Sequence, residues 1–288
     1  MKKPIHLIMP HWNGGYDVVR AYLSIIERTN YPYKLTIIDD GSDEKDAGLC
    51  FLKELAKVAP PHIKIIFNEE NIGVVKNLNN GFDIYPDLDC VRLDADIEIQ
   101  SCQWLNELVK FGKEKDNVGV VAPIALKSDM YTVFSAGQVL VVNQQDRLKY
   151  NQFPYEIFNG LHKLRSEFLA PIEVDAVLGC CAYYKREVID KLGGLDSRYF
   201  GWVEDNDFCV GTRSLGFKVF VLPHVSFNHW EHPAKRLDDE REKILQESEK
   251  IFIEKWGWSL YDPVPYFDDI KDKYKGTEIM WRYNNEKK

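Results

Sequence analysis

The stretch IKIIFNEENIGVVKNLNNGFDIYPDLDCVRLDAD, residues 63–96, gives the clearest indication of the fold of this chain. It opens with a short apolar strand pattern at 63–67, continues with helical spacing over 74–84, and ends with a second strand pattern at 90–95. Short apolar runs on either side of a helical segment are typical of parallel strands that share one sheet. The stretch therefore predicts a sheet with helices packed against it.

The same alternation extends outward over the first 125 residues. Further strand patterns lie at 5–9, 34–40 and 118–123, and further helical spacing lies at 16–29, 44–58 and 102–112. Strands that alternate with helices predict an α/β fold with a doubly wound, mostly parallel sheet. Ligands bind at the carboxyl ends of the strands in such sheets. Here those ends are mostly polar, and several are acidic.

The regular alternation of strand and helix patterns ends after residue 125. Strand patterns continue at 131–142, 174–184, 218–222 and 225–229, a long loop is expected at 143–171, helices are expected at 204–215 and 235–256, and a charged tail follows at 268–288. The last helical pattern carries many charges and one apolar stripe. We therefore expect a C-terminal helical extension that packs on the same domain.

The composition excludes several classes of protein. Of the 288 residues, 45% are hydrophobic and 28% charged, and the net charge of −8 offers no basic field to grip nucleic acid. The six cysteines form no Cys-x-x-Cys pair, which fits a reducing, cytoplasmic location. The apolar part of the N-terminal MKKPIHLIMP is too short for a signal peptide, and no window approaches the ~20 apolar residues of a membrane span. Peripheral attachment to a membrane stays open.

The segment VRLDADIEI, residues 91–99, places Asp94 and Asp96 on one face if it is a strand with a period of two. The two carboxylates repel each other, and a divalent cation such as Mg²⁺ or Mn²⁺ would relieve that repulsion, since these ions prefer oxygen ligands. A solvated strand edge explains these two residues equally well on their own. Arg92, on the same face, could steady Asp94 or contact a nucleotide, and the sequence does not choose.

Two further polar segments follow predicted strands. Asp39 and Asp40 open the segment DDGS, where a carboxylate could accept hydrogen bonds from a ribose or a base, although these are also ordinary turn residues. Gly73 precedes the helical pattern at 74–84, whose first amide groups could face a ligand. For each segment taken alone, a structural explanation is favoured.

The segment GWVEDNDF, residues 201–208, combines Trp202 with three acids. Acids in the first turn of a helix stabilise the helix dipole, but three acids and a tryptophan exceed what a helix start needs. A carboxylate here could act as a general base, beside an aromatic face for a sugar ring. His229 closes a predicted strand, whereas His224 and His232 are expected to be structural or surface residues.

In this order the segments resemble the family 2 glycosyltransferases, which have the GT-A fold. The resemblance covers roughly residues 4–230 and rests on PHWNG at 10–14, IIDDGSDE at 37–44, NIGVVKNLNNG at 71–81 and RLDADIEI at 92–99. The most specific match is LGCCAYYKREVIDKLGGLDSRYFGWVEDNDFCVGTRSLGFKV at 178–219, which resembles the acceptor-side block of the family. This block together with an upstream Asp-x-Asp outweighs the structural explanations of the separate segments.

The resemblance implies a role for the matching positions. Asp205 matches the catalytic base of the Glu-Asp motif, with Trp202 and Glu204 beside it on the acceptor side. The candidates for nucleotide binding are Pro10, Asn13, Asp39, Gly73, Asn79, Arg92 and Asp94. The candidates for metal binding are Asp96, Asp94 and His229. Because the residues after His229 depart from the family pattern, Lys235 and Arg236 are alternative contacts for the diphosphate.

The implied enzyme is an inverting hexosyl- or deoxyhexosyltransferase, with polysaccharide biosynthesis as its expected setting. It would take a sugar from a UDP, dTDP or GDP donor and place it on a hydroxyl of a glycan, or of a lipid-linked or protein-linked acceptor. Mn²⁺ or Mg²⁺ would assist a single displacement. The resemblance also divides the chain into a catalytic domain at 1–230, with a nucleotide-binding half at 1–100 and an acceptor-binding half at 118–230, and a helix and tail at 231–288.

Two other functions are compatible with a similar fold. A nucleotidyltransferase usually has a glycine-rich, basic loop after its first strand, whereas residues 10–20 contain Arg20 as their only arginine or lysine. A catalytically idle module that only binds a sugar nucleotide would not need the acids at positions 94, 96 and 205. Both features favour sugar transfer.

Overall fold

The computed structural model describes residues 2–115, 117–140, 155–164, 170–230 and 239–260. Most of the loop expected at 143–171 and all of the tail expected at 268–288 lie outside these residues. His232, Lys235 and Arg236 lie outside them as well.

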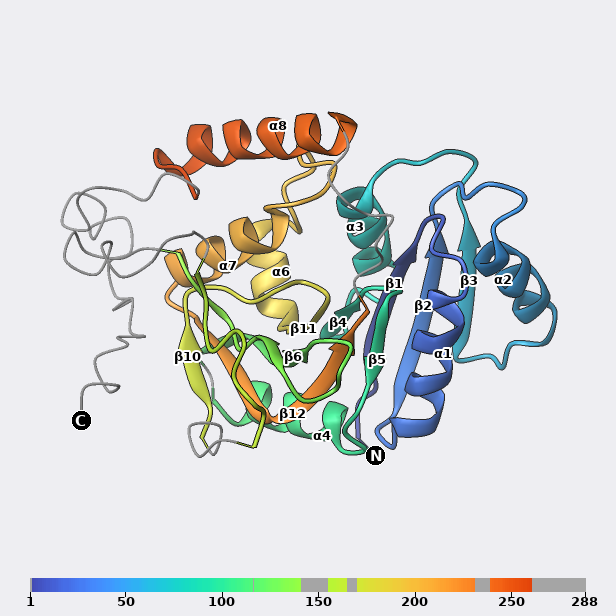
Figure 1. Ribbon diagram of the computed structural model, residues 1–288, viewed down its shortest axis with the longest axis horizontal. Helices are drawn as coiled ribbons and strands as arrows, with labels where there is room; N and C mark the ends of the chain where they lie inside the picture. Colours follow the sequence, from blue (N-terminus) through green and yellow to red (C-terminus); the bar gives the residue numbers. More distant parts are fainter. Residues whose placement is uncertain (1, 116, 141–154, 165–169, 231–238, 261–288) are drawn as a thin grey trace.

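The first half of the chain is a regular alternation of strands and helices. Its elements are β1 (Ile5–His11), α1 (Asp17–Arg28), β2 (Tyr33–Asp39), α2 (Ala47–Val58), β3 (Ile63–Phe67), α3 (Val74–Ile84), β4 (Cys90–Leu93), β5 (Ile97–Ile99) and α4 (Trp104–Glu114). β1 pairs in parallel with β2 on one side and with β4 on the other, and β2 pairs in parallel with β3. The predicted α/β fold is confirmed, and the strands β1 to β4 of this half pair with one another in parallel (Figure 1).

The second half adds strands of mixed direction. Its elements are β6 (Val118–Leu126), β7 (Val133–Ser135), β8 (Gln138–Val139), β9 (Tyr155–Glu156), β10 (Ile172–Val174), β11 (Cys181–Tyr184), α6 (Arg186–Leu192), α7 (Glu204–Ser214) and β12 (Lys218–His229). Within the described residues the main sheet has the order β10-β12-β6-β11-β4-β1-β2-β3, with β5 paired to β12 and β7 to β6. β11 runs antiparallel between β4 and β6 and joins the two halves. The sheet as a whole is therefore mixed.

Several predicted strands differ from the structure in their extent. The patterns at 218–222 and 225–229 form one strand, β12, and the described part of the pattern at 131–142 forms the short strands β7 and β8. The pattern at 174–184 is not one strand, because its first residue ends β10 at the sheet edge and its last residues form β11 in the middle of the sheet. The pattern at 91–99 is also broken, since β4 ends at Leu93 and β5 then pairs antiparallel with β12. Asp94 and Asp96 therefore lie in the connection between two strands and not on one strand face. An apolar run alone does not reveal where the chain leaves one strand for another.

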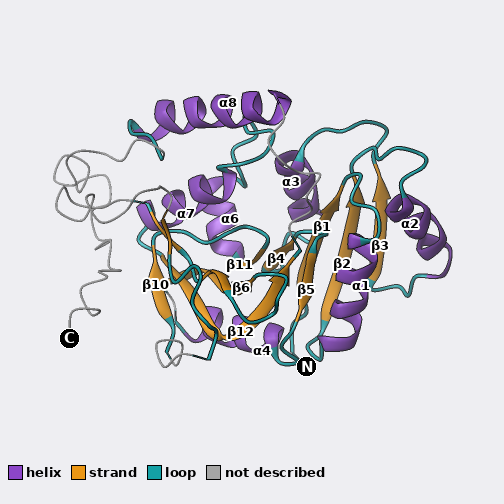
Figure 2. Cartoon of the chain, in the orientation of Figure 1, coloured by secondary structure: helices purple, strands orange, loops and turns teal. Residues whose placement is uncertain are grey.

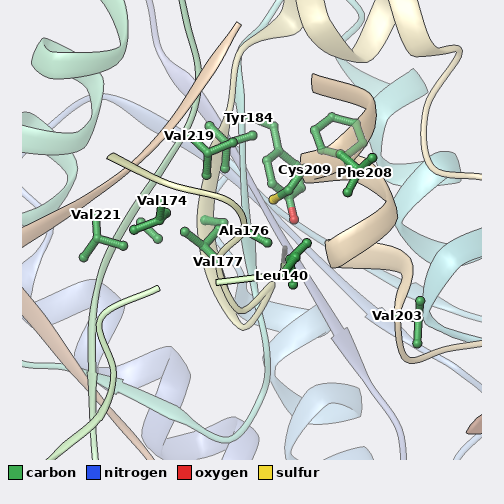
Figure 3. Close-up of a cluster of buried hydrophobic side chains, with 14 of the residues drawn as sticks. Leu140, Val174, Ala176, Val177, Tyr184, Val203, Phe208, Cys209, Val219 and Val221 are labelled. Atoms are coloured by element: carbon green, nitrogen blue, oxygen red, sulfur yellow. The ribbon is translucent and has the colours of Figure 1, made fainter. Parts of the chain in front are cut away.

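Helices cover both faces of the sheet and enclose two hydrophobic clusters. α3, α6 and α7 pack apolar side chains against one face, and α1, α2 and α4 pack against the other. Leu7 and Ile8 of β1 point into different clusters, because successive side chains of a strand point to opposite faces. Figure 3 shows part of the first cluster, where Phe208 of α7 lies 4.6 Å from Tyr184 of β11, measured between ring centres. This packing fixes α7, which carries the Glu-Asp motif, onto the sheet.

The last described helix, α8 (Asp239–Trp256), lies on the same side of the main sheet as α6 and α7 (Figure 2). Lys255 Nζ donates to one oxygen of Asp207 on α7 and Trp256 Nε1 donates to the other, each at 2.7 Å. The last acid of the Glu-Asp-x-Asp segment thus anchors α8. Among the helices described here, none combines the length and the apolar character needed to cross a membrane.

Candidate active site

Asp39 closes β2 next to the end of β1. His11 Nδ1 lies 2.9 Å from Asp39 Oδ1, and the amide of Ser42 donates to Asp39 Oδ2 at 3.1 Å. Burial alone would raise the pKa of Asp39, but the hydrogen bonds from His11 and Ser42 outweigh it, and the pKa lies below its ordinary value. Asp39 is therefore a buried, ionised carboxylate at the carboxyl end of the parallel sheet. His11 was not predicted as part of the site, although it lies in the PHWNG segment at 10–14, because the resemblance implied roles there for Pro10 and Asn13 alone.

Asn13 connects the loop after β1 to the loop after β2 by hydrogen bonds. Its backbone amide donates to Ser42 Oγ at 2.9 Å, and its side-chain Oδ1 accepts from the amide of Asp43 at 2.8 Å. Its φ of 46° lies in the left-handed region, which asparagine tolerates better than most residues. Pro10 pairs with Ile38 in the register of β1 and β2. The structure thus brings Pro10, Asn13 and Asp39 to the same edge of the sheet.

Gly73 is the residue before α3, and Asp40 holds its backbone by hydrogen bonds. Asp40 Oδ1 accepts from the amide of Ile72 at 2.9 Å, and Asp40 Oδ2 accepts from the amide of Gly73 at 3.0 Å. The φ of Gly73 is 89°, and a Cβ there would lie 2.6 Å from the carbonyl oxygen of Phe200. Glycine is needed for both reasons, and its amide is already bonded. The close approach of Gly73 to Phe200 joins the first half of the chain to the segment that precedes the Glu-Asp motif.

Asn79 makes a second connection between the halves. Its Nδ2 donates to the carbonyl oxygen of Leu195 at 2.9 Å, and its Oδ1 accepts from the amide of Leu195 at 2.9 Å. Both ends of the side-chain amide are used by this pair of hydrogen bonds. That Asn79 and Gly73 bind a nucleotide stays a prediction, and the contacts seen for both residues are structural.

Arg92 of β4 was expected either to steady Asp94 or to contact a nucleotide, and in the structure it contacts Asp94. Its Nε donates to Asp94 Oδ1 at 3.1 Å, and its Nη1 donates to Glu204 Oε1 at 2.7 Å. Arg92 is 5% exposed and Glu204 is 3% exposed, so this is a buried ion pair. Glu204 was expected to contact the acceptor, but the structure directs it inward to Arg92. A Cβ at Gly179 would lie 2.4 Å from Arg92 Nη1, so only glycine leaves room for the guanidinium.

Asp205 lies in the first turn of α7 with both oxygens held by backbone amides. Oδ2 accepts from the amide of Gly179 and Oδ1 from the amide of Asn206, each at 2.8 Å. Burial raises the pKa of Asp205, although the charge of Arg92 and the two hydrogen bonds act in the opposite direction. A carboxylate with a raised pKa and a fixed orientation is suited to accept a proton.

The turn before α7 is strained. Trp202 and Val203 have φ values of 62° and 66°, in a region that side chains rarely adopt and that is especially unfavourable for a β-branched residue. Ser248 of α8 donates to the carbonyl oxygen of Gly201 at 2.8 Å and so holds the start of this turn. Trp202 remains 38% exposed, which leaves its ring available to a ligand.

Asp96 and His229 come together from different strands. Their closest atoms, Asp96 Oδ1 and His229 Nε2, are 3.6 Å apart, and the pairing of β5 with β12 positions both residues. In the described part of the chain, no group of three His, Cys, Asp or Glu side chains gathers closely enough to hold a metal. One carboxylate oxygen and one imidazole nitrogen fit an ion that takes its other ligands from phosphate oxygens and water. Asp94, two residues from Asp96, is bonded to Arg92 instead.

Two family profiles match the sequence. The profile described as "Glycosyl transferase family 2" matches residues 6–193. The profile described as "N-terminal domain of galactosyltransferase" matches residues 159–233. Together the two matches include the nucleotide-side strand ends, the Asp-x-Asp segment and the Glu-Asp segment.

Two curated proteins are similar in sequence. An "Uncharacterized glycosyltransferase" of Haemophilus influenzae is 29% identical over 114 residues, which are 40% of this chain and 34% of that protein. An "Uncharacterized protein y4gI" of Sinorhizobium fredii is 26% identical over 254 residues, which are 85% of this chain and 26% of that protein. The chain thus spans about a third or a quarter of the length of these relatives.

Two solved structures share the fold. A crystal structure of GalNAc-T7 with UDP, GalNAc and Mn²⁺ has a TM-score of 0.66 and 16% identity, over 99% of this chain and 53% of that one. The mannosyltransferase PcManGT of Pyrobaculum calidifontis, in complex with GDP-Man and Mn²⁺, has a TM-score of 0.61 and 17% identity, over 95% of this chain and 69% of that one. At this level of identity the likeness concerns the fold, and it agrees with the predicted GT-A architecture.

Proposed function

The chain belongs to glycosyl transferase family 2, and from this premise we propose that it transfers a sugar from a nucleoside diphosphate sugar to an acceptor hydroxyl with inversion at the anomeric carbon. One observation carries the proposal. Arg92 bonds both Asp94 of the Asp-x-Asp segment and Glu204 of the Glu-Asp segment, so that residues 112 positions apart form one site. A donor-side acid and the helix that bears the candidate base are therefore held in a fixed relation.

The donor nucleotide would bind at the carboxyl ends of β1 and β2. There Asp39 offers an ionised carboxylate to ribose or base hydrogen-bond donors, and Pro10 and Asn13 line the same edge. The two solved structures of the same fold hold UDP or GDP-mannose, which supports a UDP or GDP donor, with dTDP as the third nucleotide to be tested.

Asp96 and His229, with Asp94 nearby, would hold Mn²⁺ or Mg²⁺ together with the diphosphate. The bound ion would supply positive charge beside the leaving group. The Mn²⁺ in both solved structures supports a divalent ion here. Arg92 would remain with Asp94 and Glu204 and keep their carboxylates in position.

Asp205 would act as the base. It would take the proton of the acceptor hydroxyl while the acceptor oxygen forms its bond to the anomeric carbon. In the same step the bond between that carbon and the diphosphate oxygen breaks, and the nucleoside diphosphate leaves with the electron pair. Because attack comes from the side opposite the leaving group, the anomeric configuration inverts. The raised pKa of Asp205 supports this assignment, since a general base works best with a pKa near the working pH.

The acceptor side would include Trp202, whose exposed ring offers an apolar face to a sugar. A hydroxyl of a glycan, free or linked to a lipid or a protein, is the proposed acceptor, and a hexose or deoxyhexose is the proposed sugar. Polysaccharide biosynthesis in the cytoplasm is the proposed setting. The six cysteines, all within the described residues, form no disulfide, which supports a reducing compartment.

A thermal-shift screen tests the proposal, because ligands that bind the folded state raise its apparent stability. The screen uses UDP, GDP, dTDP and their sugars, each with and without Mn²⁺, followed by measurement of nucleoside diphosphate release and of the product's anomeric configuration. We expect one nucleotide to stabilise the protein more strongly with Mn²⁺, and the matching sugar nucleotide to be turned over. Release of pyrophosphate from a nucleoside triphosphate would indicate a nucleotidyltransferase instead. Binding without any turnover would indicate an idle binding module.

A further inference from the structure

A chain of hydrogen-bonded polar groups runs from Asp205 to a glutamate outside every motif described above. The amide of Asn206 holds Asp205 Oδ1. The side chain of Asn206 donates through Nδ2 to Gln138 Oε1 at 2.5 Å, and Gln138 Nε2 donates to Glu156 Oε1 at 2.6 Å. Gln138 and Glu156 belong to β8 and β9, which pair with each other apart from the main sheet.

The carboxylate of Glu156 determines which end of each side-chain amide donates and which end accepts in this series of hydrogen bonds. An ionised carboxylate only accepts hydrogen bonds, whereas each side-chain amide has one donating and one accepting end. Ionised Glu156 therefore requires the NH₂ group of Gln138, which leaves Gln138 Oε1 for Asn206 and fixes the orientation of the Asn206 side chain in turn. Because Asn206 follows Asp205 in the first turn of α7 and its backbone amide bonds Asp205 Oδ1, a displacement of Asn206 would move the candidate base.

Burial makes an acid at this position unfavourable unless it has a role. Gln138 is 4% exposed and Asn206 is 5% exposed. Burial raises the pKa of Glu156 to about 7, against the lowering effect of hydrogen bonds from Gln138 and Ser135, and the charge of Asp205 raises it further. Ser135 and Gln138 are neutral, so Asp205 on α7 is the one charged group that acts on Glu156 in the described chain. A neutral glutamine in place of Glu156 would accept the same hydrogen bond at a smaller desolvation penalty.

We propose that Glu156 and Gln138 are positioning residues, which act through Asn206 to hold Asp205 in the orientation that receives the acceptor proton. This role rests on the function proposed above for Asp205. It assigns part of the transfer machinery to β8 and β9, which no motif of the sequence includes. It also assigns a role to Asn206, the third residue of the Glu-Asp-Asn-Asp segment, which would connect the candidate base to β8.

The test compares Glu156→Ala and Glu156→Gln with wild type, and uses Glu173→Gln as a matched control. Glu173 is also a strand glutamate with one short side-chain contact, but that contact is to Lys218 of β12, at 2.8 Å, and not to the chain of amides. The assay is release of nucleoside diphosphate from the sugar nucleotide selected by the thermal-shift screen, with water as acceptor. Nucleotide affinity is measured in parallel by calorimetry with Mn²⁺.

We expect Glu156→Ala to lower kcat by roughly tenfold to a hundredfold, since misplacement of a catalytic group by about 1 Å can have this effect. The affinity for the nucleotide and the KM for the donor should not change. Glu156→Gln should recover part of the loss and should differ from wild type in its pH profile. Wild-type kcat should rise through about pH 7 as Glu156 ionises and strengthens Asp205 as a base, and Glu156→Gln should lack this step. Glu173→Gln should match wild type throughout.

A double variant separates positioning from general damage to the fold. If Glu156 acts through Asp205, Glu156→Ala should have no further effect on kcat when Asp205 is already Asn. An equal loss in both backgrounds, or a Glu156→Ala variant with wild-type kcat, would overturn the role. Loss of nucleotide affinity together with kcat would show a structural defect and would overturn it as well. A wild-type protein that binds and turns over no sugar nucleotide would instead remove the proposed function, and this role with it.

Discussion

Asp39 and Asp205 are aspartates in two regions of the molecule, and their pKa values are shifted in opposite directions. Asp39 accepts hydrogen bonds from His11 and Ser42, and these outweigh burial and lower its pKa. Asp205 accepts two backbone hydrogen bonds, and burial raises its pKa. The first acid is suited to stay charged beside a ligand and the second to exchange a proton. The surroundings of each carboxylate therefore assign its chemistry, as in enzymes that use two carboxylates for two tasks.

The two regions also differ in how they are built. The Asp39 region is assembled by the loops that follow two neighbouring parallel strands, and the side-chain hydrogen bonds described above join His11 and Asn13 to residues 39–43. The Asp205 region collects Arg92, Gly179 and Gln138 from separate parts of the chain. The nucleotide side should therefore respond mainly to local substitutions. The base side should also respond to substitutions far away in the sequence.

The largest expected effect separates the two regions by function. Asp205→Asn keeps the shape of the side chain but removes the proton acceptor, and general bases contribute roughly 10²- to 10⁴-fold to rate. We expect sugar transfer to fall by at least ~100-fold, with nucleotide affinity retained. Calorimetry and a transfer assay measure both quantities. Asp83→Asn, an exposed position on α3, is the control. Turnover retained in the Asp205 variant would remove Asp205 from its role.

The next effect concerns the metal side of the nucleotide region. Asp96→Ala removes the carboxylate beside His229, and we expect Mn²⁺-dependent affinity for the nucleoside diphosphate to fall by roughly tenfold to a hundredfold. Affinity measured without Mn²⁺ should change little, because Asp39 and its neighbours are untouched. An unchanged calorimetric affinity in the presence of Mn²⁺ would contradict the assignment of Asp96.

Much of the fold could be predicted because its signals are local. The strand at 63–67 and the helix at 74–84 were predicted with the bounds that the structure has, since each is an apolar pattern limited by turn residues. The break within 174–184 is hard to predict because the segment between β10 and β11 is itself mostly apolar, and Asp175 and Gly179 are the only weak signals of a turn there. The left-handed conformation of Val203 could not be predicted, because valine opposes it and only the packed structure imposes it.

The candidate site was predictable where a motif names the residue. The sequence indicated Asp39, Asp96 and Asp205, and the structure gives each of them a defined setting. Contacts between distant residues were beyond its reach. The link from Arg92 to Glu204 and the link from Gln138 to Glu156 depend on how β4, α7, β8 and β9 are placed in space. No spacing within one segment encodes such placement.

A smaller effect tests whether the base region depends on α8. Lys255→Met leaves the buried carboxylate of Asp207 without one of its donors, and we expect the free energy of unfolding to fall by roughly 1–3 kcal/mol. Thermal unfolding measures the loss, with Lys243→Met at an exposed position of the same helix as control. At a temperature where the variant is folded, nucleotide affinity should equal that of wild type. A loss of affinity would show that α8 supports both regions and would erase the distinction between them.

The smallest expected effect is a difference in how the two acids change stability with pH. The pKa of Asp39 is lowered from 3.8 in the folded state, so its contribution to stability is present above pH 3.8 and is lost as the pH falls through the folded value. The pKa of Asp205 is raised from 3.8, so its contribution is fully present below pH 3.8 and is lost as the pH rises through the folded value. Below about pH 4, where the folded and unfolded states differ in the protonation of Asp39, the Tm of Asp39→Asn should fall relative to wild type as the pH rises. Above about pH 4, the Tm of Asp205→Asn should rise relative to wild type as the pH rises, because asparagine cannot ionise. Differential scanning calorimetry of both variants measures the two slopes. Slopes of the same sign would mean that the surroundings of Asp39 and Asp205 do not divide charge retention from proton transfer.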